Sequence, residues 1–219
     1  MSPDEVMSRD AVTARDEAKS RVEGPAPPQP PALENPQLVI LGDIEIASTE
    51  RFLCRLREIE ESDDDLVLEL TTLGGDAEMA RRIVLEIDRV RRQRRARGRG
   101  RFLFLGKTIV YSAGITIMAA FPPADRWLSA DTMLMIHGRT LEKTIELSGP
   151  IRASLPQVDA LHDEIKAGLA LEEEGFARLV EGSAVPLEEL RAKAAHSWFL
   201  SAAEAQRRGL VAGIWKPAP

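Results

Sequence analysis

The sequence predicts an α/β domain in which buried strands alternate with amphipathic helices. Short apolar runs that end at a glycine, such as residues 38–41 before Gly42, are typical of buried strands. Farther along, the spacing of Ile83, Ile87 and Val90 puts apolar side chains on one face of a helix. Hydrophobic residues make up 44% of the 219 residues, which is enough for a buried core and excludes wholesale disorder. Strands that alternate with helices indicate an α/β fold, and the length fits one domain or two small ones.

The strands and helices can be assigned in chain order from these patterns. Short, mostly apolar runs predict strands at residues 38–41, 66–70, 102–105, 108–110 and 133–136. Ser48 or Thr49 is expected to cap the helix that follows the first strand. Further helices are expected after Gly75 and after Ser112. The region from 142 to about 195 is mostly helical in pattern, with breaks expected at 149–150, 156 and 182–186.

The first 36 residues are expected to form a flexible, proline-rich arm. Residues 24–36 contain six of the fourteen prolines, which lack amide donors and hold the chain extended. We therefore expect an arm at 1–36, the folded domain at 37–215 and a short tail at 216–219. The first 20 residues mix acids and bases and do not resemble a secretory signal. The longest apolar run, residues 109–121, is shorter than the about 20 residues that span a bilayer. These observations predict a soluble, cytoplasmic protein that does not bind membranes.

The net charge argues against a nucleic-acid-binding protein, and the single cysteine argues against a disulfide-stabilised one. The formal net charge of −6 argues against bulk binding of nucleic acid. Eight arginines between Arg89 and Arg101 could bind phosphate, but no aromatic residues are interleaved with them. A solvated helix end and loop beside acidic neighbours is the favoured interpretation. The only cysteine, Cys54, cannot form an internal disulfide and is expected to pack in a helix, as in proteins of a reducing compartment.

Three places combine a tight turn with side chains or amides that can do chemistry. At residues 73–76, two glycines leave amide hydrogens exposed at a helix start, where they suit a developing oxyanion. At residues 111–114, Ser112 lies between a strand and a helix, where a serine is either a nucleophile or a plain N-cap. His137 directly follows a buried strand, where a histidine is either a general base or a structural residue.

A metal site is not expected from the remaining histidines. His162 and His196 lie in the helical second half, and no pair of histidines has close metal-ligand spacing. The cysteine is remote from all three histidines. We therefore expect neither a metal nor any other cofactor, and the chain contains no P-loop with which to hydrolyse ATP.

Taken together, five motifs in this order resemble the Clp protease proteolytic subunit family. They are LGD at 41–43, LGGD at 73–76, YSAG at 111–114, MIHG at 135–138 and FLSAAEAQRRGLV at 199–211. The resemblance covers residues 38–214, and MIH at this distance after the serine is its most specific element. The last motif is shared more widely among proteins of the Clp/crotonase fold. The resemblance therefore implies this fold, built from repeated strand-strand-helix units.

The resemblance also implies a function and a set of site residues. Ser112 would be the nucleophile, His137 its general base, and Gly75 and Ala113 the donors of the oxyanion-hole amides. The implied reaction is endopeptidase cleavage of unfolded polypeptides through an acyl-enzyme. The family assembles into stacked homo-oligomeric rings that receive substrate from an ATP-dependent unfoldase. The long helical region, with its apolar residues, could pack against a neighbouring subunit.

The sequence departs from the family pattern at three points. The segment before the serine is YSAG rather than a run of small residues, and the arginine run lengthens the segment between Gly75 and Ser112. The third departure concerns the acid that would orient His137, because the matching position is Ser197. A serine can fix the imidazole tautomer by hydrogen bonding but cannot stabilise the imidazolium by charge. Either the site works as a dyad, or the subunit is inactive, or another carboxylate substitutes, with Asp163, Glu188 and Glu189 as candidates.

Three other functional classes remain open at this stage. In a signal-peptide-peptidase-like enzyme, Lys143 or Lys166 would replace His137 as the base. A non-catalytic ring subunit would not need an acid to orient the histidine, which would explain the serine at position 197. A crotonase-type enzyme would act on acyl-CoA thioesters, and the arginine run is the one feature that favours it.

Overall fold

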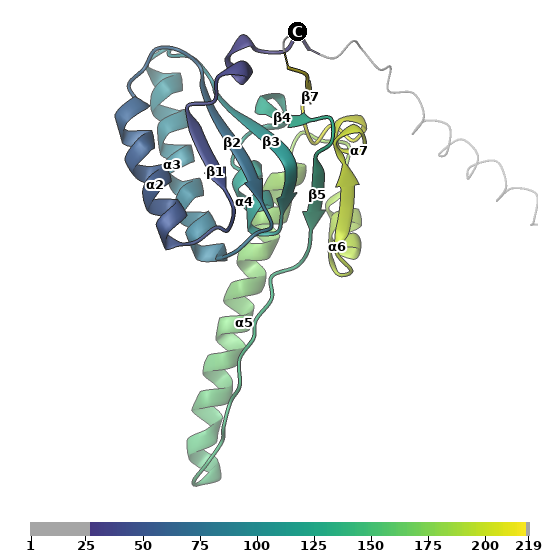
Figure 1. Cartoon of the computed structure of the whole chain (residues 1–219). Coiled ribbons are helices and arrows are strands. Elements are labelled where there is room, and N and C mark those ends of the chain that lie inside the picture. The colour runs from purple at the N-terminus through teal and green to yellow at the C-terminus, as the bar shows by residue number, and fades with distance from the viewer. Residues whose placement is uncertain (1–26, 218–219) are drawn as a thin grey trace, which may run out of the picture.

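Parallel strands form the centre of the molecule, within the α/β fold that the sequence predicts. The computed structural model describes residues 27–217, and Figure 1 shows its sheet with helices packed against it. The sheet order is β1-β2-β3-β4-β7, all parallel, while β5 pairs in parallel with β3 and β6 pairs antiparallel with β5. The strands are β1 (Leu38–Leu41), β2 (Leu66–Thr72), β3 (Phe102–Tyr111), β4 (Arg126–Ser129), β5 (Met133–Ile136), β6 (Trp198–Ser201) and β7 (Gly213–Trp215).

Helices connect these strands and bury their apolar faces against the sheet. They are η3 (Pro31–Glu34), α2 (Ile46–Ile59), α3 (Ala77–Ala96), α4 (Ala113–Ala119), η4 (Pro123–Asp125), α5 (Ile151–Val180), α6 (Leu187–Ala194) and α7 (Ala202–Arg207). Helix α2 begins before the predicted cap: Ser48 lies inside it and accepts the Glu45 amide at 2.9 Å. Within residues 27–217, none of the helices combines the length and the apolar character that crossing a membrane requires.

Side chains of β2 and β3 alternate between two apolar layers, because successive residues of a strand point to opposite faces. Leu68 and Phe104 belong to the larger core, beneath α2, α3 and α4. Val67 and Leu103 belong to a smaller cluster on the other face. Cys54 is exposed on α2, so the expectation that it packs in the core is wrong; the core-facing positions of that helix are Phe52 and Leu56.

The smaller cluster changes the boundary of the expected arm. Leu33, in the 3₁₀ helix η3, is fully buried in this cluster together with Trp127. The packed part of the chain therefore begins before residue 37, because an apolar side chain among the prolines is held against the sheet. Residues 1–26 of the expected arm and residues 218–219 of the expected tail lie outside the described residues.

The helical region after β5 also differs from the prediction. Residues 137–150 are not helical and run beside α5, the long helix that projects from the rest of the domain in Figure 1. Pro156 lies inside α5 and does not break it. A proline removes one amide donor, and the carbonyl of Arg152 that loses its partner lies in an exposed part of the helix, where water can hydrogen-bond to it.

The arginine run is partly exposed, as expected of a helix end and loop, but Arg94 turns inward and holds a neighbouring loop. Arg94 is only 2% exposed and donates to the carbonyls of Gly100 and Ser62 at 2.9 Å, and also to those of Glu60 and Asp64. Other arginines of the run pair with acids of the same chain: Arg89 with Glu60, Arg97 with Glu61, Arg99 with Glu61 and Asp63, and Arg101 with Asp125. The expected acidic neighbours therefore belong to this chain.

Replacing Arg94 with methionine is expected to lower the free energy of unfolding by about 2–4 kcal/mol, because four loop carbonyls would lose their charged donor. Chemical denaturation would measure the change. Arg95→Met is the matched control, since Arg95 lies next to Arg94 in the run but is exposed, and its change should stay within about 0.5 kcal/mol. Equal effects of the two variants would contradict the claim that Arg94 holds the neighbouring loop.

Candidate active site

The three predicted sites meet at one edge of the sheet. The Gly74-Gly75 turn follows β2, Ser112 follows β3 and His137 follows β5. These three strands are parallel neighbours, so their carboxyl ends lie side by side. The long strand β3 makes this possible by pairing with β4 through its first half and with β5 through its second half. The Ser112 amide donates to the Met135 carbonyl at 2.9 Å, which fixes the two strand ends relative to each other.

Ser112 has an unusual backbone conformation at the start of α4. Its φ is 53° and its ψ is −116°, a region that residues other than glycine rarely adopt. Such strain is often found at functional sites. Its hydroxyl makes no capping hydrogen bond to α4, so the interpretation of Ser112 as a plain N-cap is wrong. Gly74 comes so close that a Cβ there would lie 2.8 Å from the Ser112 Cβ.

The Ser112 hydroxyl contacts His137 instead. Ser112 Oγ and His137 Nε2 are 2.7 Å apart, within hydrogen-bond distance. This is the geometry in which an imidazole can take the proton of an attacking hydroxyl. The structure therefore brings together the serine and the histidine, which are 25 residues apart in sequence.

The amides of Gly75 and Ala113 lie beside this pair. Ala113 is the first residue of α4, so its amide has no acceptor one turn earlier in the helix. Around Gly75, the Gly74 carbonyl accepts from the Ile44 amide and the Asp76 amide donates to the Ile44 carbonyl. These bonds hold the turn and leave the Gly75 amide unused by it. Asp76 then caps α3 by accepting the Glu78 amide at 2.7 Å.

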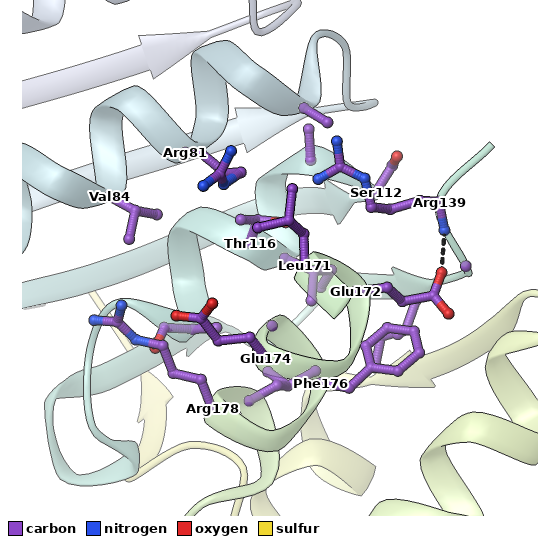
Figure 2. Close-up of a pocket in the computed structure, with 18 of the residues that line it drawn as sticks. Arg81, Val84, Ser112, Thr116, Arg139, Leu171, Glu172, Glu174, Phe176 and Arg178 are labelled. Carbon is purple, nitrogen blue, oxygen red and sulfur yellow. Dashed lines mark hydrogen bonds between the residues drawn. The ribbon is translucent and has the colours of Figure 1, made fainter. Parts of the chain in front are cut away.

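A pocket of about 360 Å³ opens beside Ser112 and His137 (Figure 2). Helices α3, α4 and α5 form its walls. Apolar side chains from all three helices contribute to the lining, among them Val84, Ile115, Leu171, Phe176 and Leu179. Charged side chains are interspersed with them: Arg81, Asp88, Arg139, Glu172, Glu174 and Arg178. The pocket therefore offers an apolar surface next to the serine, with charged side chains around it.

The structure gives His137 no carboxylate partner among the described residues. The antiparallel register pairs Ile136 with Trp198, which places Ser197 next to His137 at the end of the sheet, and no acid among residues 27–217 forms an ion pair with the imidazole. The three candidate replacements lie elsewhere. Asp163 is exposed on the projecting part of α5, Glu188 pairs with Arg191, and Glu189 pairs with Lys193 and Arg208.

Neither lysine considered as an alternative base reaches the serine. Lys143 pairs with Glu164 on the projecting part of α5, and Lys166 is exposed on the same helix. Neither lysine lines the pocket. The described residues also contain no group of three or more histidine, cysteine, aspartate or glutamate side chains placed to hold a metal.

Two residues of this site are not evident from the sequence. Arg139, two residues after His137, donates its amide hydrogen to Glu172 of α5 and pairs with Glu78 of α3. Arg139 could have been noticed in the sequence because it lies so close to His137. Glu172 could not, because it is one acid among several on a helix whose register against the sheet has no local signal.

Comparison with known proteins supports the fold. Among solved structures, a mutant of ClpP1 from Listeria monocytogenes is similar, with a TM-score of 0.64. The match is 22% identical and covers 82% of this chain and 90% of that one. No protein-family model and no curated protein matches the sequence. The predicted Clp-like α/β fold is thus confirmed.

Proposed function

We propose that this chain, which has the ClpP-like fold, is a serine endopeptidase that cleaves unfolded polypeptides through an acyl-enzyme. The observation that carries the proposal is the 2.7 Å hydrogen bond between Ser112 Oγ and His137 Nε2. It joins two residues at the ends of neighbouring strands, with a strained backbone at the serine and a pocket beside it. A purely structural serine would need neither the strain nor the histidine.

In this proposal the reaction has two halves. Ser112 Oγ attacks the carbonyl carbon of a peptide bond while His137 takes its proton, and the amides of Gly75 and Ala113 bind the developing oxyanion. The C–N bond then breaks, His137 passes the proton to the leaving amine, and an ester to Ser112 remains. Water hydrolyses this ester with His137 again acting as base, which restores the hydroxyl and releases the acid.

Adduct mapping with a fluorophosphonate probe tests the proposal. The probe phosphonylates serines that are activated by a neighbouring base, so we expect a single adduct on the peptide that contains Ser112, located by mass spectrometry. Turnover of an unstructured polypeptide should stop as the adduct accumulates. Absence of the adduct in folded protein would refute the proposal. Hydrolysis of an acyl-CoA thioester in place of polypeptide would favour the crotonase-type alternative.

We also propose that the chain works as a homo-oligomer of stacked rings in the cytoplasm, supplied with substrate by a separate ATP-dependent unfoldase. Large apolar side chains on the projecting part of α5 support association between copies. Ile151, Leu155 and Val158 are 86%, 61% and 45% exposed, and such a stripe is costly to leave in water. Light scattering coupled to size-exclusion chromatography would give the mass of the assembly.

A further inference from the structure

The segment that follows His137 is held by two carboxylates from two different helices. Glu172 of α5 accepts the Arg139 amide, with 2.5 Å between Oε2 and the amide nitrogen (Figure 2). Glu78, in the first turn of α3, accepts from the Arg139 guanidinium at 2.6 Å. Arg139 therefore joins the helix that follows the Gly75 turn to the helix that forms the far wall of the pocket.

Gly138, between His137 and Arg139, leaves room for the Glu172 carboxylate. Gly138 has no side chain, and a Cβ at that position would lie 2.9 Å from Glu172 Oε2. That separation is shorter than real Cβ contacts allow, so a side chain here would push the Glu172 carboxylate aside, whereas glycine leaves room for it. On the opposite side, the Gly138 amide approaches the Ala194 carbonyl at 3.4 Å.

Glu78 is held in its charged form at neutral pH. Hydrogen bonding from Arg139 is the largest cause that holds the pKa of Glu78 below its usual value, and Arg81 acts in the same direction. Charged acceptors form stronger hydrogen bonds than neutral ones. The contact with Glu78 therefore restrains the Arg139 side chain more firmly than a neutral acceptor would.

We propose that Glu172 is a positioning residue that orients His137 toward Ser112 by holding the backbone of Arg139. This inference rests on the proposed peptidase function. The usual orienting group, an acid on the far side of the imidazole, is missing at Ser197, and no other carboxylate contacts the His137 ring within residues 27–217. Restraint of the main chain two residues after the histidine supplies orientation by another route, since the backbone sets the direction of the Cα–Cβ bond from which the two side-chain torsions, χ1 and χ2, place the ring.

Glu172 variants test this role, with Glu173 as the matched control on the same helix. Glu173 pairs with Arg191 and does not line the pocket. Glu172→Ala is expected to lower kcat, and the rate constant of fluorophosphonate labelling, by about 10- to 100-fold with little change in KM, because the base is misplaced while the pocket remains. Glu172→Gln should keep most of the activity, since its carbonyl oxygen can accept the same hydrogen bond. Glu173→Ala should behave like the unmodified protein.

Hydrogen exchange gives a readout that does not depend on activity. The Arg139 amide should exchange at least tenfold faster in Glu172→Ala than in Glu173→Ala, as measured on peptides that cover residues 138–143. Gly138→Ala should move both readouts in the same direction but by less, because its Cβ pushes against the Glu172 carboxylate, which can shift without being removed. Faster exchange with unchanged labelling would overturn the proposal, and so would unchanged exchange. If the unmodified protein carries no adduct at Ser112, the peptidase function fails, and the positioning role falls with it even where the exchange result shows the contact.

Discussion

Replacing Ser112 or His137 with alanine is expected to reduce peptide hydrolysis by about 10³-fold or more, with the fold preserved. Ser112→Ala removes the atom that would form the acyl-enzyme. His137→Ala removes the base 2.7 Å from that atom, and a serine hydroxyl without a base is a poor nucleophile at neutral pH. Steady-state hydrolysis of an unstructured polypeptide, together with the rate of fluorophosphonate labelling, would measure both losses. Circular dichroism would verify that each variant folds.

Exposed residues of the same types provide controls for these two variants. Ser148→Ala and His162→Ala remove a serine and a histidine that are exposed and outside the pocket, and both should keep full activity. The His137 result also separates the two peptidase classes considered from the sequence. If His137→Ala still labels while Lys143→Ala or Lys166→Ala does not, the base is a lysine and the serine–histidine mechanism is incorrect.

Replacing Gly75 with alanine is expected to lower kcat by about 10²- to 10³-fold, the cost of losing one oxyanion donor. The φ of Gly75 is 131°, which side-chain-bearing residues rarely adopt, and an added Cβ would lie 2.3 Å from the Ile44 carbonyl oxygen. That oxygen is main chain and also accepts the Asp76 amide, so it cannot move aside without breaking the turn. The turn must shift, and the Gly75 amide moves with it.

Gly168→Ala is the control for Gly75→Ala, because the same substitution there causes no steric clash. Gly168 lies inside α5, and an added Cβ there would meet nothing within 4 Å. Gly168→Ala should leave hydrolysis unchanged and raise the helix stability by about 0.5–1 kcal/mol. Thermal unfolding would separate the two effects of Gly75→Ala, strain on the fold and loss of the donor. Full activity in Gly75→Ala would mean that this amide does not bind the oxyanion.

The strands that carry the candidate site could be predicted because each is an apolar run that ends where a polar or small residue must follow. Residues 66–70 and 133–136 are of this kind, and Ser112 and His137 stand out by following such runs. Strand β4 could not be predicted, because its sequence, RWLS, begins with an arginine and ends with a serine, both of them buried. Arg126 lies there only because the carbonyls of Phe121, Leu179 and Leu210, from three separate segments, accept its hydrogen bonds.

Contacts between distant segments account for what the sequence does not reveal. The division of β3 between two partner strands depends on a bend at Thr108, whose φ is 60°, and no residue type signals that bend. The arginine run suggests a surface from its composition, whereas the fold turns Arg94 inward onto loop carbonyls. Glu172 reaches Arg139 only because α5 packs against α4 in one particular register.

Helix α5 runs without interruption from its projecting end to the wall of the pocket. Leu171, Phe176 and Leu179 line the pocket, while Ile151 lies near the far end of the same uninterrupted helix. At about 1.5 Å per residue, roughly 30 Å separates Ile151 from Leu171. Phe176 and Leu179 are buried where the helix packs against the domain, so a displacement of the distal end is expected to tilt the wall that faces Ser112. We therefore expect a partner bound at the distal end of α5 to change the width of the pocket.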